Sequence, residues 1–186
     1  MDTKMVSLTK EEIEEFKQNA EMRMGVVLQA FVETGTFQAQ TTLTAAQVFD
    51  QVYTIELSET SYNAVKHHES DKVHFFQGES FQVLETLLPS ISQNIFFWLD
   101  GHWSGGGTAK GTVDCPIIEE LDVILRLTPQ ACLIAIDDVR LFGTYNNEDW
   151  VNVTEQSILD KVGSSGRVRA WRYHGDRMLI CLGEKV

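Results

Sequence analysis

The spacing of apolar residues changes after about the first 25 positions of the chain. Before that point, Thr9 stands ahead of Glu11 and Glu12, and Ile13 and Phe16 follow at helical spacing, which predicts a capped helix within an N-terminal helical segment, 1–25. After it, apolar runs rich in β-branched and aromatic residues recur. Because they are continuous rather than alternating, they predict parallel strands covered by helices on both faces. The runs are 26–32, 48–57, 73–76, 95–99 and 131–136.

Segments with helical periodicity separate these runs, at 41–47, 59–69, 80–88 and 117–127. In the last of them Ile117, Leu121, Ile124 and Leu125 fall on one face. Two further apolar runs, 168–173 and 178–182, are joined by only three residues, which is too short for a crossover helix and predicts an antiparallel hairpin. The pattern as a whole predicts an α/β fold, a Rossmann-like, doubly wound and mostly parallel sheet closed by a C-terminal hairpin.

Length and composition place this pattern in one globular unit. At 186 residues and 43% hydrophobic content, the chain is expected to form a single domain, 1–186. The net charge of -12 argues against nucleic acid and anionic membranes as partners. Three scattered cysteines suggest no disulfide framework and favour the reducing cytoplasm, and the polar first segment does not resemble a secretory signal. No apolar run approaches the ~20 residues that span a bilayer, so a soluble protein is expected.

Carboxylates and glycines follow the first three strand runs, where an open parallel sheet places its ligand crevice. Glu33 precedes Gly35, but the glycine spacing of a dinucleotide fingerprint is missing, which weakens the case for a nicotinamide cofactor. Glu56 ends the second run and can accept both hydroxyls of a ribose. Glu79, after the third run, can face an adenine amino group. Each of these residues alone could equally be a solvated acid at a strand end.

Four segments together resemble the ordered motifs of class I S-adenosylmethionine-dependent methyltransferases: residues 33–36 (ETGT), 53–58 (YTIELS), 77–80 (QGES) and 98–102 (WLDGH). The resemblance runs from about residue 26 to the terminal hairpin and implies a seven-stranded sheet whose last strand is antiparallel. The implied cofactor contacts are Glu33, Gly35 and Thr36 at the methionine part, Glu56 and Leu57 at the ribose, Glu79 and Ser80 at the adenine, and Asp100. The chain departs from the pattern at Ala39, where many relatives have glycine, and a methyl group there would crowd the loop.

A second group of carboxylates follows the fourth and fifth runs. Asp100 ends one and the pair Asp137 and Asp138 ends the other, and neighbouring strands lie about 5 Å apart, so these side chains can converge on one hard cation such as Mg²⁺. The arrangement resembles metal-dependent small-molecule O-methyltransferases, including those acting on antibiotic sugars. That resemblance implies that the metal binds two acceptor oxygens and that His102 is the nearest general base. Alternatively, the aspartates cap a turn and His102 is an ordinary loop histidine.

The segment after His102 is rich in glycine. Residues 103–111 are expected to form a flexible loop that either closes as a lid or has no such role. Asp114 and Pro116 are expected to begin the next helix, in a capping role rather than a catalytic one. The residues proposed either to line an acceptor pocket or to cover the core are Arg140, Phe142, Tyr145 and Trp150. The histidines interpreted as structural are His67, His68, His74 and His174.

The leading hypothesis is a magnesium-assisted transfer of a methyl group from S-adenosylmethionine to an oxygen of a small molecule. Three alternatives stay open: a related metal-dependent enzyme linked to hydroxylation, a non-catalytic cofactor-binding partner module, and a nicotinamide oxidoreductase. The sequence leaves open whether the chain forms a homo-oligomer.

Overall fold

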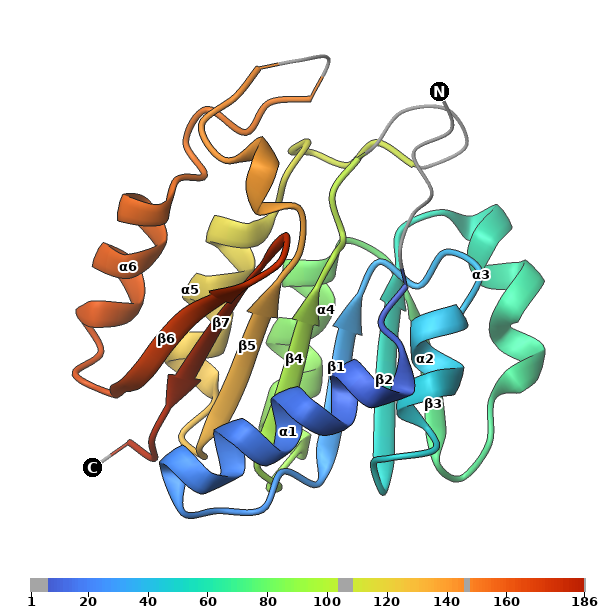
Figure 1. Cartoon of the computed structure of the whole chain (residues 1–186). Helices are drawn as coiled ribbons and strands as arrows, with labels where there is room; N and C mark the ends of the chain where they lie inside the picture. Colours follow the sequence, from blue (N-terminus) through green and yellow to red (C-terminus); the bar gives the residue numbers. More distant parts are fainter. Residues whose placement is uncertain (1–6, 104–108, 146–147, 186) are drawn as a thin grey trace.

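The computed structural model describes residues 7–103, 109–145 and 148–185. Its centre is one seven-stranded sheet in the order β3-β2-β1-β4-β5-β7-β6 (Figure 1). The strands are β1 Ala30–Thr34, β2 Gln51–Glu56, β3 Val73–Gln77, β4 Ile95–Leu99, β5 Cys132–Ile136, β6 Val168–His174 and β7 Arg177–Leu182. Every neighbouring pair from β3 to β5 is parallel, and β7 runs antiparallel to both β5 and β6. The predicted fold class and hairpin are therefore confirmed.

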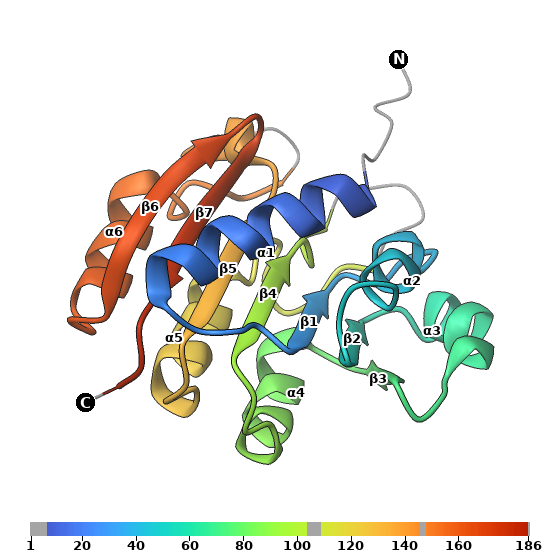
Figure 2. The same ribbon diagram turned by 60° about the horizontal axis from the view of Figure 1, so that its bottom comes forward.

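Helices cover both faces of this sheet (Figures 1 and 2). The helices are α1 Lys10–Met24, α2 Gln40–Ala45, α3 Glu59–Val65, α4 Ser80–Leu87, α5 Ile117–Leu127 and α6 Glu155–Gly163. Short 3₁₀ turns follow at Lys66–His68, Leu88–Ser90 and Val139–Leu141. Helices α1 to α3 share one apolar cluster and α4 to α6 share the other. No helix within the described ranges has the length and apolar character needed to cross a membrane.

The continuous apolar strand runs have a direct explanation in this packing. In β4, Phe96 and Trp98 join the cluster beneath α1 to α3, whereas Phe97 and Leu99 join the cluster beneath α4 to α6. Both faces of the strand are therefore buried, and polar alternation is lost. The three cysteines are buried and unpaired.

The N-terminal helix begins as its sequence predicts. The Thr9 hydroxyl accepts a hydrogen bond from the Glu12 amide at 3.2 Å, and the Glu12 carboxylate accepts one from the Thr9 amide at 2.9 Å. The helix ends at Gly25, which adopts a left-handed conformation with φ 71. Helix α1 then lies across the sheet, as Figure 2 shows.

Several element boundaries differ from the prediction. The first strand starts at Ala30 rather than 26, because Val27 lies largely in solvent before the chain enters the sheet. The second strand starts at Gln51, because Phe49 belongs to the buried turn after α2. Helix α6 was not predicted. Its apolar side chains Ile158 and Val162 are buried, but serine, glycine and charged residues dominate the surrounding sequence.

Candidate functional site

A narrow cleft lies at the carboxyl ends of β1 to β4. The crossover connections leave β1 and β4 in opposite directions, so this is the switch point at which open α/β sheets bind ligands. The cleft encloses about 80 Å³. Six of the eight residues predicted to contact the cofactor line it: Gly35, Glu56, Leu57, Glu79, Ser80 and Asp100. The other two, Glu33 and Thr36, line a neighbouring and larger hollow instead.

The loop after β1 is held in unusual backbone conformations. Gly35 has φ 86, and a Cβ atom there would lie 2.3 Å from the carbonyl oxygen of Asp100. Glycine is therefore required for the loops after β1 and β4 to approach each other. Phe37 and Ala39 also have positive φ, 47 and 59. The Ala39 methyl group is buried in the cluster beneath α1 to α3 and does not line the cleft, and its left-handed backbone carries a cost in strain.

Glu56 is fixed at the end of β2 by two backbone amides. One carboxylate oxygen accepts from the Phe37 amide and the other from the Ser58 amide, each at 2.7 Å. Each oxygen keeps a further lone pair that can accept a hydroxyl hydrogen. The carboxylate thus faces the cleft in a fixed orientation, at the place predicted for a ribose.

Glu33 lies deeper than predicted, since it is fully buried. Its carboxylate accepts hydrogen bonds from the hydroxyls of Thr42 and Thr54, the latter at 2.7 Å. Burial raises the pKa of Glu33 to about 7, because those two hydrogen bonds only partly offset the loss of solvent.

The segment after residue 108 covers the other end of the cleft. The Thr112 amide donates to the Glu79 carboxylate at 2.7 Å, and Ala109 and Gly111 line the cleft beside it. The proposed lid falls mainly on residues 104–108, which lie outside the described residues. The expected capping role of Asp114 is wrong: Pro116 is the cap residue of α5, and Asp114 pairs instead with Lys110 at 2.9 Å.

A larger hollow of about 710 Å³ adjoins the cleft. The hollow and the cleft share Gly35, Phe37, Asp100 and His102 as a common wall. Asp100, His102 and Asp138 come together there, with one potential ligand atom from each lying within 4.8 Å of the others. His102 Nε2 lies 2.8 Å from Asp138 Oδ2 and 3.7 Å from Asp100 Oδ1. The loops after β4 and β5 therefore meet as predicted.

Charges dominate this cluster. Burial alone would lower the pKa of His102, but the hydrogen bond to Asp138 and the neighbouring carboxylates outweigh burial and raise it to about 9. Burial, followed by the charge of Asp137, raises the pKa of Asp100 well above its ordinary value. In the absence of a cation the imidazole is thus protonated at neutral pH, and it would have to lose that proton before acting as a base.

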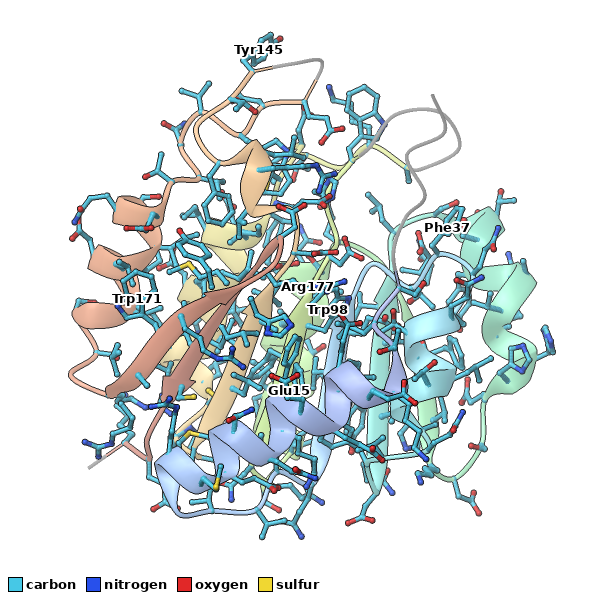
Figure 3. The ribbon with its side chains drawn as sticks, in the orientation of Figure 1. Glu15, Phe37, Trp98, Tyr145, Trp171 and Arg177 are labelled. Carbon is cyan, nitrogen blue, oxygen red and sulfur yellow. The ribbon has the colours of Figure 1, made fainter. Side chains whose placement is uncertain are left out.

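Asp137, the third predicted metal ligand, is oriented differently from the other two aspartates. Its Oδ1 lies 3.4 Å from Arg177 Nε, and Arg177 also reaches Glu12 of α1 at 2.6 Å. Arg177 stacks over the Trp98 ring at 5.7 Å, and Figure 3 shows the two side chains next to each other behind α1. Burial and the adjacent Asp138 raise the pKa of Asp137 to about 6. Among these residues the structure therefore places ligand atoms of Asp100, His102 and Asp138 within 4.8 Å of one another, whereas Asp137, although its charge still acts on Asp100, is held toward Arg177.

The four residues proposed for an acceptor pocket separate in the structure. Arg140 lines the hollow and forms ion pairs with Asp138 and Asp176. Trp150 is wholly buried and Phe142 stacks on it at 6.2 Å, so both cover the core. Tyr145 is 73% exposed and points outward at the edge of the molecule (Figure 3).

Two charged residues of this site were missed by the sequence analysis. Glu148 lies 3.2 Å from His102 Nδ1, and Arg177 holds Asp137. Neither follows a parallel strand directly, so the rule that located the aspartates did not apply to them. The sequence does not distinguish Glu148 from its neighbour Asp149, since both are acidic residues of one loop.

Comparison with solved structures identifies this architecture. An O-methyltransferase from Bacillus cereus, solved with S-adenosylhomocysteine, matches with a TM-score of 0.66 at 14% identity over 96% of this chain and 83% of that one. The Streptomyces achromogenes O-methyltransferase TomG is involved in tomaymycin synthesis and was solved with S-adenosylmethionine. It matches with a TM-score of 0.59 at 15% identity over 98% of this chain and 84% of that one. The chain has a methyltransferase fold.

The same methyltransferase fold is present in a Staphylococcus aureus protein assigned provisionally as a caffeoyl-CoA O-methyltransferase. It matches with a TM-score of 0.61 at 17% identity over 96% of this chain and 85% of that one. No protein-family model and no curated protein matches the sequence. The seven-stranded sheet that the sequence resemblance implies, with its antiparallel last strand, is confirmed in three dimensions.

Proposed function

We propose that this chain is an S-adenosylmethionine-dependent methyltransferase that methylates an oxygen of a small molecule with the help of a divalent cation. One observation carries the proposal: a cleft lined by fixed carboxylates and the larger hollow share a wall that contains Asp100 and His102. A cofactor in the cleft and an acceptor in the hollow would therefore meet at this wall. The methyltransferase fold, found in neighbours solved with S-adenosylmethionine or its product, supports this assignment.

The cleft offers the groups that an adenosine requires. Glu56 would accept the two ribose hydroxyls through its remaining lone pairs, and Glu79 with Ser80 would border the adenine. S-adenosylmethionine would supply the transferable methyl group, carried on a sulfonium. At about 80 Å³ the cleft is smaller than the ~300 Å³ of typical small-molecule sites, so the covering segment at Thr112 must move outward on binding.

The hollow offers the groups that a cation and an acceptor require. Its volume of about 710 Å³ lies in the usual range for small ligands, roughly 300 to 1,000 Å³. Asp100 and Asp138 would hold the cation, with Asp137 restrained by Arg177 behind them. A bound divalent cation lowers the pKa of a coordinated hydroxyl. Asp100, at the shared wall, would then orient the acceptor oxygen toward the cleft. The oxygen would form a bond to the methyl carbon as the sulfonium–carbon bond breaks, which leaves neutral S-adenosylhomocysteine, and the hydroxyl proton would pass to solvent.

A second candidate, a non-catalytic partner module, is favoured by the hydrogen bonds already present in the cleft. Glu56 and Glu79 both accept backbone amides, and the volume between them is small. Such a module would bind the cofactor weakly and transfer no methyl group.

Calorimetric titration with S-adenosylhomocysteine, with and without divalent cation, separates the two candidates. We expect micromolar binding by the natural chain, a loss of at least tenfold for Glu56→Gln, and no change for Glu59→Gln, which removes an exposed carboxylate three residues away. Binding followed by methyl transfer to a vicinal diol or catechol supports the methyltransferase. Binding without transfer to a broad acceptor panel favours the module, and no binding would reject both.

A further inference from the structure

Glu148 is placed to act on the cation cluster through His102. It lies in the loop between the 3₁₀ turn Val139–Leu141 and α6, far in sequence from His102. Its Oε2 atom is 3.2 Å from His102 Nδ1 and accepts a hydrogen bond from Trp150 Nε1 at 3.0 Å. The indole therefore anchors the carboxylate beside one nitrogen of the imidazole.

The imidazole itself has little freedom to turn. The side chain of His102 is only 7% exposed, and the buried ring of Trp150 meets it edge-on at a centroid distance of 4.9 Å. With Nδ1 facing Glu148, Nε2 is the atom directed between Asp100 and Asp138. A cation held by those two aspartates would thus have Nε2 as its immediate neighbour.

Two arrangements are then possible for a cation at this place. An imidazole that keeps its Nε2 proton would oppose the cation, and the packing against Trp150 prevents the ring from swinging aside. If the proton is released to solvent, the freed Nε2 lone pair becomes a third ligand. Glu148 favours this second arrangement. Its carboxylate contacts Nδ1 at 3.2 Å without the alignment of a hydrogen bond, and a small turn of the carboxylate would let it accept the Nδ1 hydrogen, which fixes the tautomer and makes Nε2 a better donor to a metal.

We propose that His102 is a nitrogen ligand of the cation site, with Asp100 and Asp138, and that Glu148 is the positioning residue that orients it. The inference rests on the proposed function for the existence of the cation, and it changes the expected metal. Mg²⁺ prefers oxygen ligands alone, whereas an imidazole beside two carboxylates suits first-row transition ions such as Fe²⁺ and Zn²⁺. Mn²⁺, a first-row ion that carboxylates also bind, is the paramagnetic probe for such a site. Three protein ligands also leave coordination positions for two acceptor oxygens.

The test uses the purified full chain, free of affinity tags, loaded with Mn²⁺ alone. Binding is followed by the loss of the free-ion electron paramagnetic resonance signal, and electron spin echo modulation reports a directly bound ¹⁴N nucleus. We expect ¹⁴N modulation in the natural chain and its loss in His102→Gln. We also expect Mg²⁺ to displace Mn²⁺ only at a concentration at least about tenfold higher.

Glu148→Gln tests the positioning role, because glutamine keeps an acceptor for Trp150 but removes the charge facing Nδ1. We expect a loss of Mn²⁺ affinity of about 10-fold, toward the lower end of the range known for such outer residues. Asp149→Asn is the matched control: it neutralises the adjacent, exposed carboxylate and should leave affinity and the ¹⁴N signal unchanged. Glu148→Asp, which restores the charge, should recover part of the affinity.

Each outcome decides the inference. Mn²⁺ binding without ¹⁴N modulation would overturn the ligand role of His102, and equal losses for Glu148→Gln and Asp149→Asn would overturn the positioning role. Absence of any Mn²⁺ binding would overturn both roles together with the cation assistance. S-adenosylhomocysteine binding, measured separately, would still test the methyltransferase proposal by itself.

Discussion

The cleft and the hollow use carboxylates in opposite ways. In the cleft, Glu56 and Glu79 accept hydrogen bonds from backbone amides, whose positions are set by the strands and loops themselves. In the hollow, Asp138 contacts two charged side chains, the imidazole of His102 and the guanidinium of Arg140. The carboxylates of the cleft are therefore held by the backbone, and Asp138 of the hollow is held by charged side chains that can exchange partners.

Because of this difference, the cleft is suited to recognising a ligand and the hollow to responding to a bound cation. An amide that is part of the fold cannot leave its carboxylate without moving the chain, so the cleft presents a fixed pattern to a ligand. A guanidinium can be displaced by a cation, and an imidazolium can lose its proton beside one, with little backbone movement, so the hollow can change its charge when a metal arrives. The four predictions below test this contrast between the two regions.

The largest expected effect concerns the close approach that builds the shared wall. Gly35→Ala would place a Cβ atom 2.3 Å from a backbone oxygen, at φ 86, so we expect the free energy of unfolding to fall by about 3 kcal/mol or more. Gly25→Ala is the control, since it has φ 71 but open space around it, and it should cost about 1 kcal/mol. Urea unfolding measures both. Equal losses would mean that strain at positive φ, rather than the contact with the Asp100 loop, explains the glycine.

Glu33, buried between the two regions, gives the next largest effect. Its folded-state pKa of about 7 exceeds the ordinary 4.5, so between these values the folded chain keeps a proton that the unfolded chain has lost. Its contribution to stability is complete below the lower value and is lost as the pH rises through the upper one, by up to about 3 kcal/mol. We therefore expect Glu33→Gln to gain stability relative to the natural chain between about pH 5 and about pH 8, as judged by urea unfolding. Exposed Glu69→Gln should track the natural chain, and parallel curves for Glu33→Gln would contradict the prediction.

A smaller effect is expected at the covering segment of the cleft. In Gly111→Ala the new Cβ would lie 2.8 Å from Glu79 Oε2, the end of a flexible side chain that can shift. Stability should therefore fall by less than about 1 kcal/mol, while the Thr112 amide loses its acceptor and exchanges hydrogen faster. Hydrogen exchange measured by mass spectrometry or NMR checks this. Unchanged protection at Thr112 would show that the bond to Glu79 does not hold the segment.

The smallest effect concerns the guanidinium of the hollow. Arg140→Gln removes a charge that competes with a cation for Asp138, so we expect Mn²⁺ affinity to rise about two- to threefold, with stability nearly unchanged because the guanidinium is half exposed. Arg126→Gln, which breaks an exposed ion pair with Glu85 elsewhere, is the control and should leave affinity as it is. A lower affinity for Arg140→Gln would mean that Arg140 orients Asp138 rather than competing for it.

The sequence predicts well which residues gather at the site, because these residues follow the ends of strands. Continuous apolar runs mark buried parallel strands, and the residues that follow them, Glu56 and Asp100 among them, meet at one edge of the sheet in any such fold. Glu33 also ends a strand, but its orientation into the interior depends on Thr42 and Thr54, which only the packing of α2 against β2 brings near. The topology was therefore foreseeable from the sequence, whereas the direction of individual side chains was not.

The pairing of charged side chains in the hollow could not be predicted from the sequence, for a related reason. Asp137 and Asp138 are neighbours in sequence, yet one pairs with Arg177 of the terminal hairpin and the other with His102. Asp138 adopts a left-handed backbone conformation with φ 58, which separates the directions of the two carboxylates. No periodicity or spacing encodes that turn, and Glu148 lies in a loop without any repeating pattern.

The position of β7 between β5 and β6 has a consequence for biosynthesis. Strands β1 to β5 can pair as they emerge, but β5 has an uncovered edge until residues 177–182 have been made and inserted antiparallel beside it. During that interval the nascent chain carries an apolar strand with unpaired backbone groups, a known template for aggregation. Ribosome-bound chains ending before β7 should therefore recruit chaperones strongly, and release from them should coincide with closure of the sheet.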